Sequence, residues 1–413
     1  MTLSYPFTAE QGKGTPQAGS NATTGPPWLQ VMSHLSPRYG GIASSVPRLA
    51  RATEDAGLRS CPIVGFCDAE ELAHISQEQR VGAAVFPTSR LRWMVDSQLQ
   101  RSFKNTIRAS SGVHIHGIWE THSMVAAALA RDCKRPYVIS AHGMLEPWAL
   151  RHKRLKKAAY AALVEIRNMK HAACLRALSV DEGNDYRRLG LTAPIAIIPN
   201  GVEPGPAVSC AMFLNAYPKL ASKRIVLFLG RLHHKKGLHM LLKAWALVVP
   251  KVDDLHLVIA GPDSEDTLAS LKELHSSLKI QSSVTFAGML NGEEKWSALA
   301  AASVFVLPSY SEGFSVAVLE ALSMAVPVIV SSACHIPEVE TAACGWVISP
   351  DGQRLERALV EYAALSAASL AQMGKQGEEL VRRRFTSSVV GKQMSEVYNW
   401  LDGGNRPVSV EIS

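Results

Sequence analysis

The chain has 413 residues, of which 47% are hydrophobic and 19% charged, so it is too long for one hydrophobic core and favours two domains. This composition excludes a disordered protein, and the apolar runs are too short for a membrane-spanning helix. The net charge of +7 is uneven, because residues 1–200 carry 24 Lys and Arg against 15 Asp and Glu. The first half is therefore expected to meet an anionic partner or simply to be soluble.

Residues 1–27 are rich in Gly, Ser, Thr and Pro, which predicts a flexible N-terminal tail without a secretory signal. The seven cysteines are scattered and form no Cys-x-x-Cys pair. This pattern argues against a disulfide framework or a zinc site and favours a reducing compartment. We therefore expect a cytoplasmic protein.

Short apolar runs alternate with segments of helical period along the whole chain, which is typical of parallel βαβ units and an α/β fold. Strands are expected in the first half at Leu29–Met32, Ile63–Phe66, Val113–Ile115, Tyr137–Ser140 and Ile195–Ile198. In the second half they are expected at Ile225–Leu229, Leu257–Ala260, Val284–Phe286, Val304–Leu307, Val328–Val330 and Trp346–Ile348. A turn-rich stretch at 199–206 separates the halves, so we predict domains at 28–200 and 205–385.

Three histidines lie at or just after the ends of predicted strands of the first half, namely His114, His116 and His142. A metal would want acidic or cysteine partners in register, so we interpret them as hydrogen-bonded side chains of a cleft and predict no metal site. The basic run at 151–157 opens a predicted helix that continues to about residue 170. Such a helix can rest on anionic lipid or be a solvated face, and the sequence leaves both open.

In the second half, a buried strand ends at Gly230 and a basic loop then leads to a helix that begins near Gly237. Parallel sheets bind ligands at the carboxyl ends of their strands, and helix N-termini attract phosphate. Arg231 and Lys236 add two cations, which suits a diphosphate, although a solvated basic turn has the same composition. The apolar spacing from 238 to 248 predicts a one-faced helix that Pro250 ends.

A second loop, Ser309–Ser315, also follows a buried strand and opens a helix. Glycine at 313 lets backbone approach a ligand, and the amides of Phe314 and Ser315 could cap a phosphate. The next helix is apolar on nearly every side, so Glu320 needs partners, which ribose hydroxyls would supply. A partly exposed helical glutamate is the alternative.

These motifs together resemble the family 4 glycosyltransferases of the GT-B fold, of the kind that build bacterial surface polysaccharides. The resemblance rests on Glu312 and Glu320 with seven residues between them, on Gly230–Leu232, on Lys236–Gly237 and on Asn200–Val202. It covers roughly residues 28–400. It implies two Rossmann-like domains facing each other across a cleft, with a last helix at 386–402 that packs back on the first domain.

The resemblance also implies roles for single residues. Arg231 and Lys236 would bind the donor diphosphate, Glu312 would lie near the donor sugar, and Glu320 would hold the ribose. His142 would face the transferring sugar. Further donor contacts are implied at Gly40, Gly41, Gly230, Leu290, Gly313, Phe314 and Ser315.

The implied reaction is transfer of a hexose-type sugar from a nucleoside-diphosphate donor to a glycan or lipid-linked acceptor, with retention at the anomeric carbon. The chain contains no Asp-x-Asp motif, so fixed cations and helix N-termini must neutralise the leaving group without a divalent metal or other cofactor. The protein would work in the cytoplasm or peripherally on the inner face of the membrane. The alternatives are an epimerase or hydrolase for nucleotide sugars on the same fold, or a non-catalytic basic binding protein, although no nucleic-acid-binding motif supports the latter.

Overall fold

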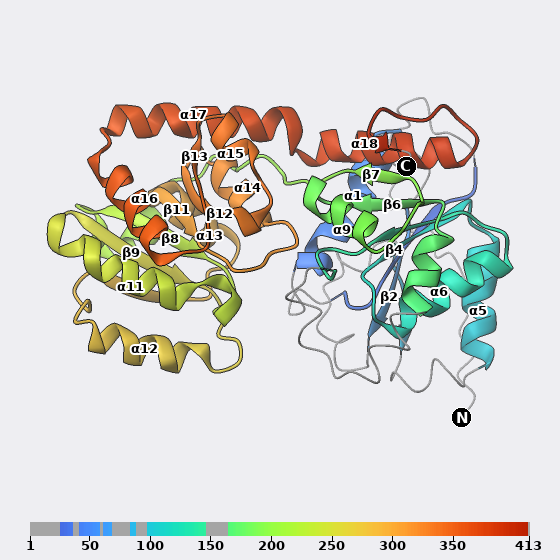
Figure 1. Cartoon of the computed structure of the whole chain (residues 1–413), viewed down its shortest axis with the longest axis horizontal. Coiled ribbons are helices and arrows are strands. Elements are labelled where there is room, and N and C mark those ends of the chain that lie inside the picture. The colour runs from blue at the N-terminus through green and yellow to red at the C-terminus, as the bar shows by residue number, and fades with distance from the viewer. Residues whose placement is uncertain are drawn as a thin grey trace.

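The computed structural model describes residues 25–35, 41–57, 61–67, 83–87, 97–145 and 164–411. Within them the strands form two sheets, which lie in two lobes side by side (Figure 1). In the first sheet the order is β14-β7-β6-β5-β4-β1-β2-β3, with β14 antiparallel and the other pairs parallel. The second sheet is parallel throughout, in the order β10-β9-β8-β11-β12-β13.

The strands of the first sheet are β1 (Trp28–Met32), β2 (Ile63–Cys67), β3 (Ala83–Pro87), β4 (Gly112–His116), β5 (Tyr137–Ser140), β6 (Cys174–Ala177), β7 (Ile195–Ile197) and β14 (Val410–Glu411). Those of the second are β8 (Arg224–Leu229), β9 (Leu255–Ala260), β10 (Val284–Gly288), β11 (Ala302–Leu307), β12 (Val328–Ser331) and β13 (Gly345–Ile348). Every predicted strand is present. Strands β3, β6 and β14 are not among the predicted ones; β6 carries the charged Arg176, and β14 is only two residues long.

Helices cover the faces of both sheets, as parallel strands require. The α-helices are α1 (Gly41–Asp55), α5 (Ser97–Arg108), α6 (Thr121–Asp132), α9 (Val180–Arg188), α10 (Ala211–Ala216), α11 (Leu238–Val248), α12 (Thr267–Ser277), α13 (Gly292–Ala301), α14 (Val316–Ser323), α15 (Glu338–Thr341), α16 (Gly352–Ala364), α17 (Ala367–Arg384) and α18 (Ser387–Leu401). Residues 164–170 are also helical. Single 3₁₀ turns form η2 (Pro218–Leu220), η3 (His234–Lys236), η4 (Val249–Lys251) and η5 (Ser332–Cys334).

Helix α11 shows why the apolar spacing predicts the element correctly. Its residues at the predicted positions are all fully buried or nearly so, namely Leu238, Leu241, Leu242, Trp245 and Val248. Pro250 lies in the 3₁₀ turn that follows, because proline cannot continue the α-helix without losing a hydrogen bond.

The last two helices run along one edge of the molecule, α17 over the second sheet and α18 over the first (Figure 1). Thr386 caps α18 by accepting a hydrogen bond from the backbone of Val389. The helix packs closely on α1, since a β-carbon at Gly391 would lie 2.3 Å from the carbonyl oxygen of Ala52. The chain therefore returns to the first sheet after completing the second.

Candidate functional site

The basic loop after β8 lies at the carboxyl edge of the second sheet. Gly230 donates its backbone N–H to Ala260 at the end of β9 (3.0 Å). Lys236 closes η3, and Gly237, with a φ of +71°, turns the chain into α11. A β-carbon at Gly237 would lie 2.2 Å from the carbonyl oxygen of Pro308. Only glycine therefore lets this loop approach the loop that follows β11 so closely.

An ion pair joins these two loops. Lys236 Nζ lies 2.5 Å from Glu312 Oε1, and the two side chains are only 19% and 12% exposed. The same carboxylate oxygen accepts a hydrogen bond from Ser309 Oγ (2.6 Å), and the backbone of Tyr310 donates to Lys235 (2.7 Å). The structure thus brings together the predicted diphosphate-binding lysine and the predicted sugar-binding glutamate.

Arg231 and the start of α14 contribute further groups at this edge. Arg231 is exposed on the loop after β8. Ser315 is the N-cap residue of α14 and makes no side-chain capping bond, while the neighbouring Phe314 ring packs 6.0 Å from that of Phe385. The first turn of a helix carries backbone N–H groups without intrahelical partners, which attract anions. Cations and amides that suit a phosphate therefore lie on loops of the adjacent strands β8 and β11.

Glu320 lies in α14 and has a partner that the sequence analysis did not identify. Lys295 Nζ of α13 lies 2.9 Å from Glu320 Oε1, with the side chains 28% and 15% exposed. The helix is less enclosed than expected at its start, where Val316 and Ala317 are half-buried, although its later apolar residues are fully buried. Glu320 therefore has a cationic partner before any ribose arrives, and the ribose role stays a prediction.

Leu290 lies between β10 and α13 and is half-buried against the core of the second lobe. Directly after it, Asn291 and Glu294 form a reciprocal capping box that fixes the start of α13. Lys295 then links α13 to Glu320 of α14. The structure thus connects the helix that follows Leu290, a predicted donor contact, to the predicted ribose-binding residue through one lysine.

His142 and Gly143 follow β5 of the first sheet and meet the loop of Glu312 and Gly313. A β-carbon at Gly143 would lie 2.3 Å from the Cα atom of Gly313. His142 and Gly143 both have positive φ, of 56° and 75°, and the left-handed region is strained for histidine. Gly143 N–H donates to Glu182 Oε1 (2.6 Å), which holds this turn in place. The predicted sugar-facing histidine therefore lies beside the predicted donor loop.

A second contact joins the lobes near the same place. His335 Nδ1, after β12, lies 2.8 Å from Asp181 Oδ2 of α9. Burial raises the pKa of the neighbouring Glu182, whose two carboxylate oxygens accept backbone N–H groups from Gly143 and Leu178. The start of α9 is thereby fixed both to the His142 turn and to the other lobe.

The three predicted cleft histidines form one hydrogen-bonded group in the first lobe, in which His114 and His116 are buried and His142 is half-buried. His116 Nδ1 lies 3.1 Å from His142 Nε2, and its Nε2 lies 2.9 Å from Gln30 Oε1. His114 contacts the Tyr398 hydroxyl of α18 (2.6 Å) through Nδ1 and Ser140 Oγ through Nε2. These contacts agree with the interpretation of the three residues as hydrogen-bonded side chains, and the absence of a metal stays a prediction.

Burial keeps the three rings neutral. Desolvation, with the buried Arg176 cation as the second cause, lowers the pKa of His142 to about 3. Desolvation is also the largest cause that lowers the pKa of His114 and of His116 well below the ordinary value. At neutral pH each imidazole therefore has one donor and one acceptor nitrogen.

Sequence reasoning missed Gln30, Arg176 and Tyr398. Gln30 is the one polar residue of the otherwise apolar β1, Arg176 interrupts β6, and Tyr398 lies on the apolar face of α18. The guanidinium of Arg176 donates to the carbonyl oxygens of Ile198 (3.0 Å) and Pro199 (2.7 Å). A polar residue inside an apolar strand was the available signal for the first two, because such groups need buried partners.

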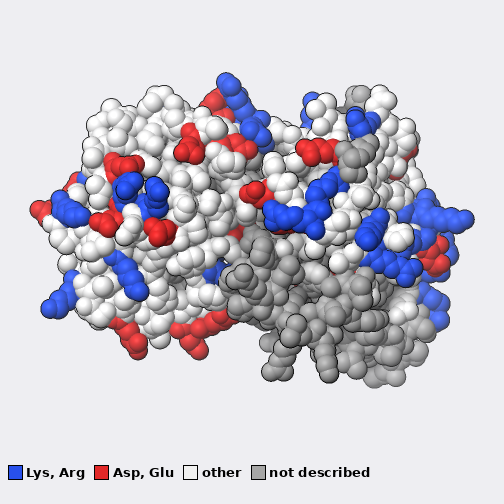
Figure 2. Space-filling view, viewed as in Figure 1, with Lys and Arg blue, Asp and Glu red and all other residues white. Residues whose placement is uncertain are grey.

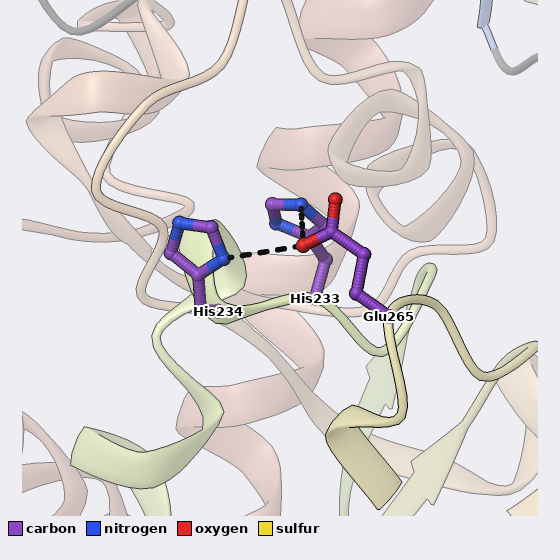
Figure 3. Close-up of side chains that lie close together, drawn as sticks. All are labelled: His233, His234 and Glu265. Carbon is purple, nitrogen blue, oxygen red and sulfur yellow. Dashed lines mark ion pairs between the residues drawn. The ribbon is translucent and has the colours of Figure 1, made fainter. Parts of the chain in front are cut away.

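His233, His234 and Glu265 lie close enough to hold a metal, with their ligand atoms within 4.8 Å of one another (Figure 3). His233 Nε2 lies 3.2 Å and His234 Nδ1 3.8 Å from Glu265 Oε2. However, His233 Nδ1 accepts the backbone N–H of Lys235 (3.1 Å), so the proton of a neutral ring is on Nε2 and points to the carboxylate. His233 thus caps the turn through Nδ1 and donates to the Glu265 carboxylate through Nε2. Its ring therefore has no free lone pair for a metal.

Two predicted features lie outside the described residues. Gly40 precedes the described part of α1, which begins at Gly41, where a β-carbon would meet nothing within 4 Å. The basic run at 151–157 also lies outside, although the end of its expected helix is described at 164–170. None of the described helices is both long and apolar enough to cross a membrane.

Two protein-family models match the chain. The model described as glycosyl transferase 4-like domain matches residues 40–201, and the model described as glycosyl transferases group 1 matches residues 214–380. Between them they include the strands of both sheets other than β1 and β14.

Curated relatives match mainly over half of the chain. A phosphatidyl-myo-inositol mannosyltransferase of Mycobacterium tuberculosis is 28% identical over 219 residues, which are 52% of this chain and 56% of that protein. The lipopolysaccharide core biosynthesis mannosyltransferase LpcC of Rhizobium leguminosarum is 26% identical over 226 residues, 52% of this chain and 62% of that protein. The matches thus span less than two thirds of these relatives.

A solved structure is similar over nearly the whole chain. The crystal structure of Anabaena Alr3699/HepE in complex with UDP has a TM-score of 0.74 and is 18% identical, covering 90% of this chain and 100% of that one. This similarity, with one parallel and one almost entirely parallel sheet, confirms the predicted fold of two α/β domains.

Proposed function

Because this chain belongs to the family 4 glycosyltransferases of the GT-B fold, we propose that it transfers a hexose-type sugar from a nucleoside-diphosphate donor to an acceptor, with retention at the anomeric carbon. The observation that carries the proposal is the contact between the His142–Gly143 turn of one lobe and the Glu312–Gly313 loop of the other. It brings a neutral histidine from the first sheet beside the basic donor loops of the second.

The leaving group in this reaction is a nucleoside diphosphate, on which negative charge develops as the glycosidic bond breaks. Arg231, Lys236 and the backbone N–H groups of Phe314 and Ser315 are the groups that would stabilise this charge. Arg231 and Lys236 lie on the loop after β8 and the two amides at the start of α14, so all of these donors belong to one edge of the second sheet. Fixed cations and amides make a divalent metal unnecessary in this proposal.

Lys236 is partly neutralised by Glu312 in the absence of donor. A diphosphate would compete for the lysine, and the freed carboxylate of Glu312 could then accept hydrogen bonds from sugar hydroxyls. Glu320 would hold the ribose in the same exchange, since Lys295 already fixes the position of its carboxylate. Both ion pairs therefore preorganise donor-binding carboxylates.

We propose a glycan or lipid-linked glycan as acceptor, because two of the relatives are named for phosphatidyl-inositol and lipopolysaccharide core synthesis. On the described part of the first lobe, the visible face shows mainly Lys and Arg, whereas both signs are mixed on the second lobe (Figure 2). Helix α5 contributes three basic residues and no acidic one. A basic surface of this kind would attract the inner, anionic face of a membrane.

The first experiment is a thermal-shift screen with UDP-, GDP- and ADP-sugars, followed by product analysis with and without a lipid-linked acceptor. Transfer with the anomeric configuration retained, seen by NMR, supports the proposal. Release of free sugar or formation of an epimer without acceptor would contradict it and favour a hydrolase or epimerase.

The same assay tests metal independence. Activity is expected to survive an excess of EDTA, because the charge on the leaving group is met by side chains and amides. Strict dependence on added Mn²⁺ would contradict this part of the proposal. If activity did depend on a metal, a His233→Asn variant would show whether that metal binds at the His233–His234–Glu265 group, because only then would the substitution abolish the dependence.

A further inference from the structure

A chain of buried hydrogen bonds connects His142 to the C-terminal helix. It passes from His142 to His116 on β4 (3.1 Å), then to Gln30 on β1 (2.9 Å) and to Tyr398 on α18 (3.0 Å). Gln30, His114 and Tyr398 are fully buried, and His116 is 1% exposed. In a buried, low-dielectric site each donor needs an acceptor as its partner. The donors therefore follow one another in a single direction along the chain of hydrogen bonds.

The direction follows from the Gln30 amide as it lies in the structure. Gln30 Nε2 donates to the Tyr398 hydroxyl, which leaves Oε1 to face His116 Nε2. An amide oxygen only accepts, so the proton of His116 is on Nε2 and its Nδ1 is an acceptor. His142 must therefore donate from Nε2 to His116 Nδ1.

The other branch of the network fits the same direction. The Tyr398 oxygen accepts from Gln30, and its hydroxyl proton is directed to His114 Nδ1 at 2.6 Å rather than to Gln30 Oε1 at 3.4 Å. His114 then donates from Nε2 to Ser140 Oγ (2.8 Å). Every bond in the group has one donor and one acceptor when the rings are neutral.

We propose that Tyr398 is a positioning residue, which through Gln30 and His116 holds His142 in the Nε2–H tautomer, so that His142 Nδ1 accepts a hydrogen bond from a hydroxyl of the sugar substrate. This inference rests on the proposed glycosyl transfer and adds to it the direction of the hydrogen bond between His142 and the sugar. In the described part of the chain, His142 Nδ1 has no hydrogen-bond partner. It is the ring atom left for a ligand beside Gly313.

The tautomer depends on Tyr398 because of how Gln30 can turn. Without the phenolic oxygen, nothing on α18 accepts from Gln30 Nε2, and the amide can rotate to donate to His116 instead. His116 would then carry its proton on Nδ1, and His142 would become the Nδ1–H tautomer. A donor would replace an acceptor at the atom that faces the substrate.

The test uses long-range ¹H–¹⁵N NMR of the imidazole rings in the full chain, with the His142 signals assigned by their loss in His142→Asn. The Tyr398→Phe variant keeps the ring that stacks on Trp28 at 4.4 Å between centroids, so its packing is retained. Tyr362→Phe is the control, because Tyr362 is equally buried but lies in the second lobe on α16. The wild type should show a protonated Nε2 at His142, and Tyr398→Phe should show a mixed or Nδ1–H state.

The kinetic measurement uses the same variants. Tyr398→Phe should lower kcat about three- to tenfold, the effect of weakening one hydrogen bond to the substrate, with little change in donor affinity. An Nδ1–H tautomer in the wild type, or an unchanged tautomer in Tyr398→Phe, would overturn the inference. An unchanged kcat despite an altered tautomer would also overturn it. The NMR result in the free protein stands whether or not sugar transfer is observed, so failure of the relay and failure of the proposed function are distinguishable.

Discussion

The Cα atom of Gly313 lies only 2.3 Å from the position that a β-carbon would take on Gly143, so the two glycines form a close backbone contact between the lobes. The approach is reciprocal, since a β-carbon on Gly313 would lie 2.6 Å from the carbonyl oxygen of His142. Any side chain here forces backbone to move, which displaces His142 from the donor loops.

Gly313→Ala should therefore reduce catalysis much more than stability. Gly313 does not need positive φ, so the effect is a steric displacement of His142 against Glu312. A misplacement of about 1 Å typically costs about a hundredfold in rate, and we expect kcat/KM to fall by that order. Gly352→Ala is the matched control, because its β-carbon would meet only Met240 at an ordinary 3.9 Å. Equal kcat/KM in both variants would refute the role of this contact.

Arg231→Ala should weaken donor binding without affecting folding. Arg231 is exposed, and exposed substitutions away from special features change the free energy of unfolding by about 0.5 kcal/mol or less. A lost charged hydrogen bond to phosphate is worth about 1.5–3 kcal/mol, which predicts a roughly ten- to hundredfold higher Kd for the nucleoside diphosphate in calorimetry. Lys219→Ala, another exposed cation of the second lobe, should leave Kd unchanged.

Lys236→Ala should have a larger effect, because it also leaves the 12%-exposed carboxylate of Glu312 with Ser309 as its partner. Unchanged nucleotide affinity in both the Arg231 and Lys236 variants would contradict a diphosphate site at this edge. The two results together separate a binding role from an ion pair that only joins the loops.

A Glu320→Gln variant tests whether the carboxylate binds the ribose, when its affinities for a ribonucleotide and a deoxyribonucleotide are compared. If the carboxylate binds the ribose hydroxyls, the variant should lose affinity for a ribonucleoside diphosphate about tenfold, and much less for its 2′-deoxy counterpart. If Glu320 only pairs with Lys295, both nucleotides should lose affinity equally. Lys295→Met is the companion variant, since it removes the cation and leaves the carboxylate. Circular dichroism checks that each variant is folded.

The sequence predicted the strands well because buried parallel strands are continuous apolar runs. Strand β6 could not be predicted in this way, because Arg176 interrupts its apolar run. The sequence also gives no sign that this cation is buried with the backbone carbonyl oxygens of residues 198 and 199 as its partners. Periodicity reports the face of an element but not the identity of its neighbours. For this reason the sequence indicates that Glu320 needs a partner but does not identify Lys295, which is 25 positions away.

The chain of hydrogen bonds from His142 to Tyr398 could not be predicted for a related reason. Gln30 and Tyr398 in this chain are 368 residues apart, and His114 and Tyr398 in the other branch are 284 apart. Only the return of α18 to the first sheet brings them together. Motifs locate residues at strand ends, whereas the hydrogen-bond partners that set a tautomer depend on tertiary packing.

Stability should fall as pH drops from 6.5 to 5, because buried histidines are neutral in the folded chain. The folded pKa of His142 is lowered to about 3, whereas an unfolded histidine has a pKa of about 6.5. Between these values the unfolded chain binds one more proton, so stability is fully present above about pH 6.5 and falls by about 1.4 kcal/mol per pH unit for this residue. His114 and His116, whose pKa values are also lowered, add to the slope.

Buried acids oppose this trend over part of the range. The pKa values of Glu165 and Glu182 are raised, chiefly by desolvation. Their contribution to the stability of the folded chain therefore decreases as pH rises above about 4.5. Urea unfolding of His142→Asn at pH 7.5, 6.0 and 5.0 isolates the histidine contribution. Between pH 6.0 and 5.0 the wild type should lose about 1 kcal/mol more stability than His142→Asn, with a smaller difference between pH 7.5 and 6.0. His171→Asn, at an exposed position, is the control substitution. Equal slopes in wild type and His142→Asn would show that His142 is not held neutral by its surroundings.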